Sequence, residues 1–207
     1  MALDQGNAVE PPADLAARKL TLKQIEVDPA WSRIGKTIHD PLFFSDSPGW
    51  RFSAKDMPGV LYVGDEAETC FWEVFWDDLM TRPEKDRRLD AAKVAERSVW
   101  VLSLPRKLHV VNTLEAATMH ELSAPDGTFQ GPYINCQRWA RALRAHSDKP
   151  DGILYGSARR TGHRCLALFE ERFKSDLWPT PGPGTPLLRS PELAQVVGKY
   201  GLSKVSS

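Results

Sequence analysis

One stretch of the sequence, residues 59–76, restricts the fold more than any other. The run GVLYV at its start has the composition of a buried strand. Behind it, apolar residues recur at i, i+3, i+4, i+7 and i+8, the spacing of an amphipathic helix. They are Ala67, Cys70, Phe71, Val74 and Phe75. Asp65 and Glu68 are spaced like a capping box, with Asp65 as the cap. The stretch therefore predicts a strand followed closely by a helix.

Glu73 lies off the apolar stripe of this helix. At about 100° per residue it projects about 130° from the centre of the stripe, and Trp72 and Trp76 project from the same far side. The commonest interpretation of such a glutamate is a solvated charge beside tryptophans that pack on another element. Taken alone, the helix favours that interpretation.

The composition bounds the class of protein. With 207 residues, the chain is long enough for one substantial domain. Because 27 Lys and Arg residues balance 27 Asp and Glu residues, no net charge favours binding to nucleic acid or to an anionic membrane. The N-terminus lacks the regions of a secretory signal, and no stretch approaches the length of a membrane span. The three cysteines lack CxxC spacing, so we expect buried, reduced thiols in a cytoplasmic protein.

Other segments carry the spacing of strands and helices, which predicts an α+β domain. Further strands are expected at 98–104, 107–111, 151–157 and 164–169. A helix is expected over roughly 133–146, where four apolar residues share one face. The charged stretch 81–97 is interpreted as a solvated connection with one helical turn.

The C-terminal part has a different character. Residues 176–189 carry four prolines and two glycines and are expected to be irregular. Ser190 and Pro191 then provide a cap and a first-turn proline, which predicts a terminal helix.

The sequence lacks the common catalytic motifs. The sequence has no GxxxxGK[ST], GxGxxG, HExxH or GxSxG motif, and its five histidines show no metal-ligand spacing. His163 and Cys165 could be a catalytic pair, but Cys165 opens an apolar strand. Glu170 or Glu171 could join Glu73 as the paired carboxylates of a glycosidase, yet nothing in the spacing selects this over solvated charges.

One constellation remains. Three segments each place polar residues among apolar ones: GWRFSAK with Arg51, GVLYVGD with Tyr62, and ILYGSARR with Ser157 and Arg159. Taken singly, Arg51 is interpreted as a half-buried arginine that stacks on its neighbouring tryptophan. Tyr62 alone is a core tyrosine, and Ser157 alone is a turn serine.

Read together, these segments resemble the RES domain, the toxin half of a bacterial type II toxin–antitoxin pair. The resemblance spans roughly residues 31–173 and is carried by WSRIG, GWRFSAKDMPGVLYVGDEAETCFWEV, NCQRWARAL and DGILYGSARRTGHRCLALF. The chain departs from the family's pattern at GWRFS, at Cys70-Phe71 and at Cys136, and none of these departures touches the four polar positions. Residues 1–30 are then an N-terminal extension with a short helix, and 174–207 a Pro-rich wrap and helix on the same domain.

The resemblance implies a fold and a site. The family's fold is related to that of ADP-ribosyltransferase toxins, with a split, bent sheet and flanking helices around a cleft that binds NAD+ as the substrate. Carried onto this sequence, the functional set is Arg51, Tyr62, Glu73 and Ser157, with Arg33 and Arg159 as further candidates for the phosphates. Glu73 and Arg51 would be catalytic, and the others would bind the dinucleotide.

These residue types suit NAD+ chemistry without a metal. The nicotinamide is already cationic and leaves as a neutral base, so the group to stabilise is the oxocarbenium-like ribose. A carboxylate at Glu73 matches that cation better than it matches the ground state, and Arg51 offers a planar fork for the diphosphate. Tyr62 could stack on a base, and Ser157 could hydrogen-bond the ribose or amide. On this hypothesis Glu73 faces the cleft, and Trp72 and Trp76 form or brace its wall.

The resemblance leaves the acceptor of ADP-ribose open. Water or phosphate would make the chain an enzyme that depletes NAD+, whereas a side chain of a target protein would make it a protein ADP-ribosyltransferase. The family further implies a partner, a helix-turn-helix (Xre-like) antitoxin that occludes the cleft and carries the DNA binding. From another class, the chain could be a catalytically inactive module that only binds the antitoxin, although the intact set of four polar residues argues against this.

Overall fold

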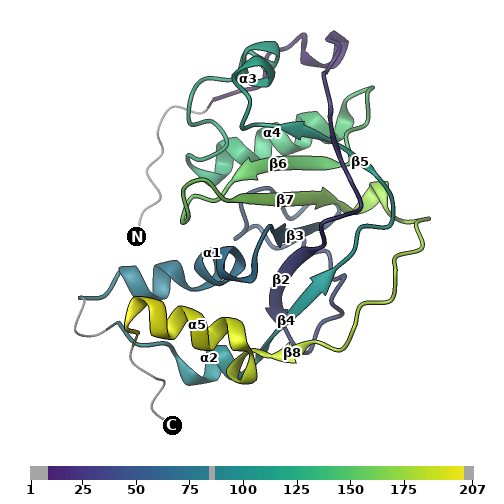
Figure 1. The fold of residues 1–207 in the computed structure, drawn as a ribbon. Helices are drawn as coiled ribbons and strands as arrows, with labels where there is room; N and C mark the ends of the chain where they lie inside the picture. Colours follow the sequence, from purple (N-terminus) through teal and green to yellow (C-terminus); the bar gives the residue numbers. More distant parts are fainter. Residues whose placement is uncertain (1–8, 84–86, 203–207) are drawn as a thin grey trace.

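The computed structural model describes residues 9–83 and 87–202. The remaining residues, which include parts of the expected N-terminal extension, of the charged stretch 81–97 and of the C-terminal segment, lie outside the described residues. Within the described part, the chain folds around a bent sheet flanked by helices, the α+β architecture that the sequence predicts (Figure 1).

The sheet has eight strands in the order β1-β5-β6-β7-β3-β2-β4-β8. In chain order they are β1 (Lys23–Ile25), β2 (Trp31–Lys36), β3 (Val60–Gly64), β4 (Arg97–Leu102), β5 (Leu108–Asn112), β6 (Gly152–Gly156), β7 (Arg164–Phe169) and β8 (Thr185–Pro186). All neighbours are antiparallel except β5 and β6, which are parallel.

The sheet bends where β2 meets β3. These two strands pair only at Ser32 opposite Gly64, whereas β2 pairs with β4 from end to end and β3 likewise with β7. Figure 1 shows β2 and β4 turning away from the direction of β3, β7 and β6. The backbone of β2 and β3 therefore separates beyond one pair, and this opening positions the site described below.

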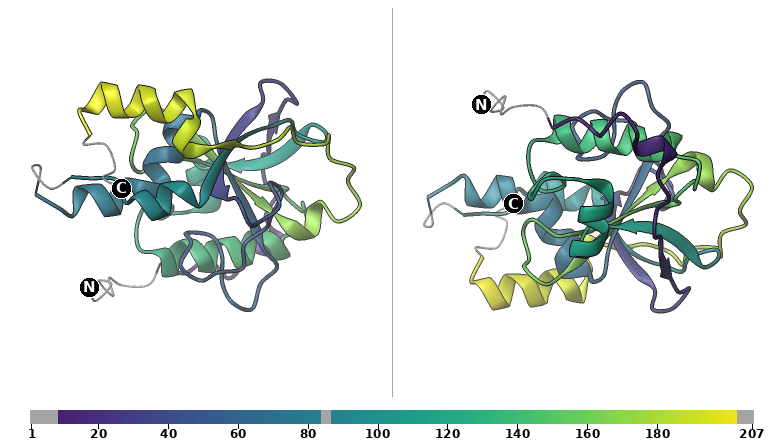
Figure 2. Two further views of the ribbon diagram at one scale, coloured as in Figure 1. Left: turned by 90° about the horizontal axis from the view of Figure 1, so that it is seen from below. Right: turned by 90° about the horizontal axis from the view of Figure 1, so that it is seen from above.

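Five helices cover the sheet: α1 (Ala67–Met80), α2 (Ala91–Ala95), α3 (Ala116–Leu122), α4 (Tyr133–Ala145) and α5 (Pro191–Tyr200). Because strand side chains alternate between faces, Tyr62 and Ala167 pack toward α4, whereas Leu61 and Leu168 pack into the core on the opposite face. A separate cluster joins α1, α2 and α5 to β2 and β4. Figure 2 shows α4 and α5 on opposite sides of the sheet.

The start of α1 differs from the expected capping box. The N-cap is Glu66, without a side-chain cap hydrogen bond, and Asp65 is engaged elsewhere. One carboxylate oxygen of Asp65 accepts from Thr69 Oγ1 at 2.8 Å and the other from the backbone N–H of Arg164 at 2.9 Å. Asp65 thus ties α1 to the first residue of β7, a partner far away in the sequence.

The other periodic segments form the predicted elements. The helix expected at 133–146 is α4, and the four further strands are β4, β5, β6 and β7. Ser190 caps α5 through its hydroxyl, which accepts from the backbone N–H of Leu193. Three short elements, β1, α3 and β8, were not expected from the sequence, and the short helix expected within residues 1–30 is a single turn at Leu15–Ala17.

Candidate functional site

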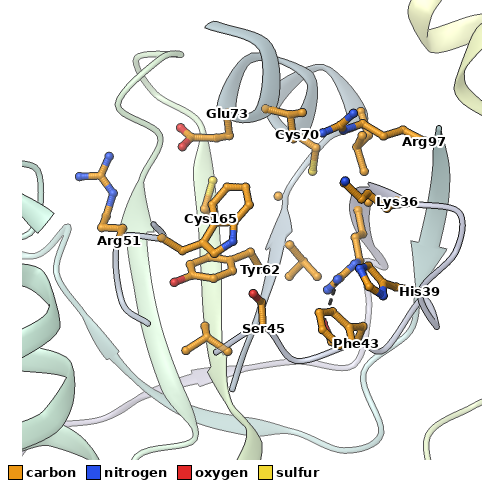
Figure 3. A pocket seen from close by; sticks show the side chains of 18 of the residues that line it. Lys36, His39, Phe43, Ser45, Arg51, Tyr62, Cys70, Glu73, Arg97 and Cys165 are labelled. Carbon is orange, nitrogen blue, oxygen red and sulfur yellow. Dashed lines mark hydrogen bonds between the residues drawn. The ribbon is translucent and has the colours of Figure 1, made fainter. Parts of the chain in front are cut away.

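A cavity of about 270 Å³ opens at the separation of β2 and β3 (Figure 3). Its walls come mainly from both strands, from α1, from the loop before β3 and from the start of β7. Gly64 allows α1 to approach this point, since a Cβ there would lie 2.9 Å from Cys70 Sγ. The close contact between Gly64 and Cys70 therefore places α1, and with it Glu73, against the opening of the sheet.

Glu73 enters the cavity from α1 and is held by Ser157. Ser157 follows β6, and its Oγ lies 2.6 Å from Glu73 Oε1. The same Oγ accepts from the backbone N–H groups of Arg159 and Arg160 at 3.2 and 3.0 Å. Because a hydroxyl has one proton and two acceptor lone pairs, Ser157 donates its proton to Glu73. The hydroxyl is thereby fully engaged within the protein.

Arginine side chains of the loop after Ser157 also bind α1. Arg159 Nη2 donates to Asp77 at 2.8 Å, and its guanidinium lies over the ring of Trp76. Arg160 Nη1 donates to Glu66 and to Thr69 Oγ1, both at 2.9 Å. These contacts hold the loop against the helix on either side of Glu73.

Arg51 occupies the same end of the cavity as Glu73 (Figure 3). Its side chain is only 7% exposed, donates through Nη1 to the Phe129 carbonyl at 3.2 Å, and lies over the rings of Tyr133 and Tyr155. Within residues 9–83 and 87–202, no carboxylate forms an ion pair with it. A buried guanidinium without a carboxylate is available to an anionic ligand.

The turn that carries Arg51 is fixed from α4. Gln137 Nε2 donates to the carbonyls of Pro48 and Trp50, at 2.9 and 3.1 Å. Trp50 is 43% exposed and its ring stacks at a tilt on that of Tyr62, with centroids 6.0 Å apart. The ring pair forms an aromatic wall next to Arg51.

Tyr62 presents its ring to the cavity, while its hydroxyl is bound in the protein. The hydroxyl accepts from the backbone N–H of Phe52 at 2.9 Å and lies 3.0 Å from Ser53 Oγ. Burial raises the pKa of Tyr62 above its ordinary value. The tyrosine therefore links β3 to the turn of Arg51 as a neutral hydrogen-bonding group.

The opposite end of the cavity is cationic. Arg33, Lys36, His39 and Arg97 line it, and Figure 3 shows the last three on the side away from Arg51 and Glu73. Arg33 Nη2 donates to the Phe43 carbonyl at 2.9 Å, but its buried Nε has no hydrogen-bond partner. Burial lowers the pKa of Arg33 to about 10.

The sequence predictions map onto this site unevenly. The cavity brings together Arg51, Tyr62, Glu73 and Arg33. Ser157 reaches the site only through Glu73, and Arg159 is held at Asp77 and Trp76 outside the lining. Lys36, His39 and Arg97 were not singled out from the sequence. Lys36 pairs with Arg97 across β2 and β4, a register that no local pattern reveals.

Trp72 and Trp76, which were predicted to form or brace the wall of the cleft, do not line the cavity. Trp72 is 2% exposed and packs edge-on against Tyr200 of α5, with ring centroids 4.8 Å apart. Trp76 packs against Trp72 and Arg159. Both tryptophans therefore brace α1 from outside the cavity.

The described residues show neither a metal-binding cluster nor a membrane-spanning helix. Among residues 9–83 and 87–202, no group of three or more His, Cys, Asp or Glu side chains is placed to hold a metal ion. In the same part of the chain, no helix combines the length and the apolar character needed to span a bilayer. All three cysteines are buried and free, as the sequence predicted.

Comparison with known families identifies the chain. Its sequence matches the RES domain over residues 30–190, most of its length. The chain belongs to the RES-domain family. Its fold is similar to a solved structure, the MbcT–MbcA toxin–antitoxin complex of M. tuberculosis, with a TM-score of 0.58, 15% identity, and coverage of 83% of this chain and 92% of that one. No curated protein matches the sequence. The RES match ends just before α5, the helix against which Trp72 packs.

Proposed function

We propose that this RES protein is the toxin of a bacterial toxin–antitoxin pair and cleaves NAD+ at the bond between nicotinamide and ribose. One observation carries the proposal. Among the described residues that line the cavity, Glu73 is the one carboxylate; it is fixed by Ser157 and lies among cationic and aromatic side chains. That arrangement suits a ligand with a diphosphate, a base to stack, and a sugar that becomes positively charged in the transition state.

The reaction follows from these groups. The C–N bond breaks and nicotinamide leaves with its electron pair as a neutral base. The ribose C1′ becomes oxocarbenium-like, and the carboxylate of Glu73 stabilises it. Arg51 binds phosphate or hydroxyl oxygens beside it. Water then bonds to C1′ and releases a proton, giving ADP-ribose, or inorganic phosphate bonds there instead. A side chain of a target protein as the acceptor would make the chain a protein ADP-ribosyltransferase.

The partner that we propose is an antitoxin that covers the cavity. MbcT, the solved structure with a similar fold, is a toxin bound to an antitoxin. In this chain, the loop between β2 and β3 places exposed apolar side chains at the cavity: Phe43 and Trp50 line it at 37% and 43% exposure, and Ile38, at 82%, precedes the lining residue His39. An apolar rim of this kind suits a protein partner. A helix-turn-helix domain of that partner would supply DNA binding, consistent with the zero net charge of this chain.

Growth of a bacterial host tests the proposal in cells. Expression of the wild type without antitoxin should arrest growth, and Glu73→Gln should relieve the arrest because the amide cannot stabilise a cation as a carboxylate does. Asp77→Asn is the matched control, since Asp77 is an exposed carboxylate one turn further along α1 and pairs with Arg159. It should remain toxic. Equal toxicity of wild type and Glu73→Gln, at equal expression, would refute the role of Glu73. A wild type without toxicity would favour an inactive module.

A further inference from the structure

The described residues that line the end of the cavity away from Glu73 include three Lys and Arg side chains. We call Arg33, Lys36 and Arg97 the distal cations. Arg33 is central to them because its half-buried guanidinium donates to one carbonyl and forms no ion pair with any carboxylate among the described residues. A guanidinium in this state can bind an anion.

The charges that line the whole cavity also favour a second anionic group in the ligand. Of the described residues that line it, four are Lys or Arg and one, Glu73, is a carboxylate. Lys36 and Arg97 share one further carboxylate, Glu96, at 3.5 and 2.6 Å. Arg33 and Arg51 have none within residues 9–83 and 87–202 and lie in different parts of the cavity. If Arg51 contacts the diphosphate beside the reacting ribose, the distal cations are left for a second anionic group.

The second anionic group cannot be the acceptor of ADP-ribose, because the distal cations lie too far from the reacting carbon. An acceptor must reach C1′ of the ribose beside Glu73, whereas Lys36, His39 and Arg97 lie on the opposite side of the cavity (Figure 3). The distal end also offers a platform for a base, because His39 and Phe43 stack with ring centroids 4.2 Å apart and planes 9° from parallel. A platform with cations next to it suits an adenosine whose ribose carries a phosphate.

We propose that the distal cations bind a phosphate on the adenosine ribose, so that the enzyme prefers NADP+ to NAD+. This inference rests on the proposed function for the orientation of the dinucleotide, with nicotinamide at Glu73. Arg33 then provides the planar fork and Lys36 the point charge, the pairing of residue types that suits a phosphate monoester. Glu96 lies outside the cavity lining and pairs with both Lys36 and Arg97. Arg97 also donates to the Lys93 carbonyl, so Arg33 and Lys36 are the cations that we assign to the phosphate.

Binding of two probes tests the subsite without catalysis. Adenosine 2′,5′-bisphosphate and adenosine 5′-monophosphate differ only in the phosphate at issue. By titration calorimetry, the wild type should bind the bisphosphate about tenfold more tightly, and Lys36→Gln should remove most of this difference. Lys23→Gln is the matched control: Lys23 also lies on a strand, is similarly exposed and has one weak ion pair, but is remote from the cavity. It should bind both probes as the wild type does.

Kinetics separate this inference from the proposed function. The KM for NADP+ should be about fivefold below that for NAD+, and Lys36→Gln should raise only the former. Equal affinity of the wild type for the two probes overturns the inference, as does an equal effect of Lys36→Gln on both dinucleotides, which would place the diphosphate on the distal cations. Tight binding of the bisphosphate without nicotinamide release would instead retain the subsite and refute the proposed function. Nicotinamide release from NAD+ together with equal binding of the two probes would retain the proposed function and refute the phosphate subsite.

Discussion

Ser157 Oγ lies 2.6 Å from Glu73 Oε1 and donates its only proton to it. Ser157 lies in the loop after β6 and Glu73 in α1, 84 residues apart in the sequence, and the contact fixes the carboxylate at the opening between β2 and β3. Two backbone N–H groups fill the remaining lone pairs of the hydroxyl. We therefore propose that Ser157 acts on the site by positioning Glu73, whereas the family resemblance predicts a contact with the substrate.

Replacing Ser157 by alanine should lower kcat and leave KM almost unchanged. The carboxylate loses its orientation, which matters most in the transition state, so we expect kcat to fall about tenfold to a hundredfold. Ser157→Thr retains the hydroxyl and should restore most of the rate. Steady-state nicotinamide release, with circular dichroism to verify folding, measures both variants. A rise in KM at constant kcat would instead mean that Ser157 holds the substrate.

Removing the hydroxyl of Tyr62 should destabilise the turn that carries Arg51. In Tyr62→Phe, the backbone N–H of Phe52 loses its partner, at a cost of about 1–3 kcal/mol in the free energy of unfolding. Tyr200→Phe is the control, because its hydroxyl donates to Glu68 at the surface and its loss should change stability by about 0.5 kcal/mol or less. Urea denaturation of the wild type and both variants measures the change in the free energy of unfolding. Equal effects would contradict a structural role for the Tyr62 hydroxyl.

Stability should fall at alkaline pH because of a buried thiol. Burial raises the pKa of Cys70 from 9.0 to about 12. Between these values the unfolded chain releases the proton and the folded chain retains it, so the stabilisation present below pH 9 is lost as the pH rises. The free energy of unfolding should decrease by about 1.4 kcal/mol per pH unit for such a group. In Cys70→Ala, the free energy of unfolding should fall with pH less steeply by that amount. Urea denaturation at several pH values between 9 and 12 measures both slopes. An unchanged slope would mean that Cys70 ionises freely in the folded protein.

The segment after residue 175 should be required for a stable, active enzyme. Leu187, Leu193 and Val196 are buried against α1 and its neighbours, and Tyr200 packs on Trp72. A chain ending at residue 175 exposes that surface and should melt at a markedly lower temperature or fail to fold. Leu193→Ala in the full chain should cost about 2 kcal/mol or more. A truncated chain with wild-type stability and activity would show that the segment covers nothing essential.

Local patterns were sufficient to predict most elements of the fold. The apolar spacing of α1 and α4 and the cap of α5 depend on residues within one or two turns, and the structure confirms those elements. The N-cap of α1 was wrong because Asp65 has a distant partner, the N–H of Arg164. The element on which Trp72 packs was not predictable for a similar reason, since α5 comes from the far end of the chain.

The candidate site was only partly predictable. Arg51, Tyr62 and Glu73 stand out because each is polar within an apolar run, and all three line the cavity. The distal cations do not stand out, because their proximity depends on the register of β2 with β4 and on the separation of β2 from β3. The bond from Ser157 to Glu73 likewise joins positions 84 residues apart. Such relationships require the tertiary structure.

The most direct test of the account is nicotinamide release from NAD+ by the purified protein, followed by liquid chromatography with and without phosphate. The wild type should release nicotinamide, and Glu73→Gln should do so about a hundredfold more slowly or less, while Asp77→Asn keeps the wild-type rate. Release that rises with phosphate would identify phosphate as the acceptor, and equal release in both buffers would identify water. Release by Glu73→Gln at the wild-type rate, or no release by the wild type in either buffer, would contradict the account.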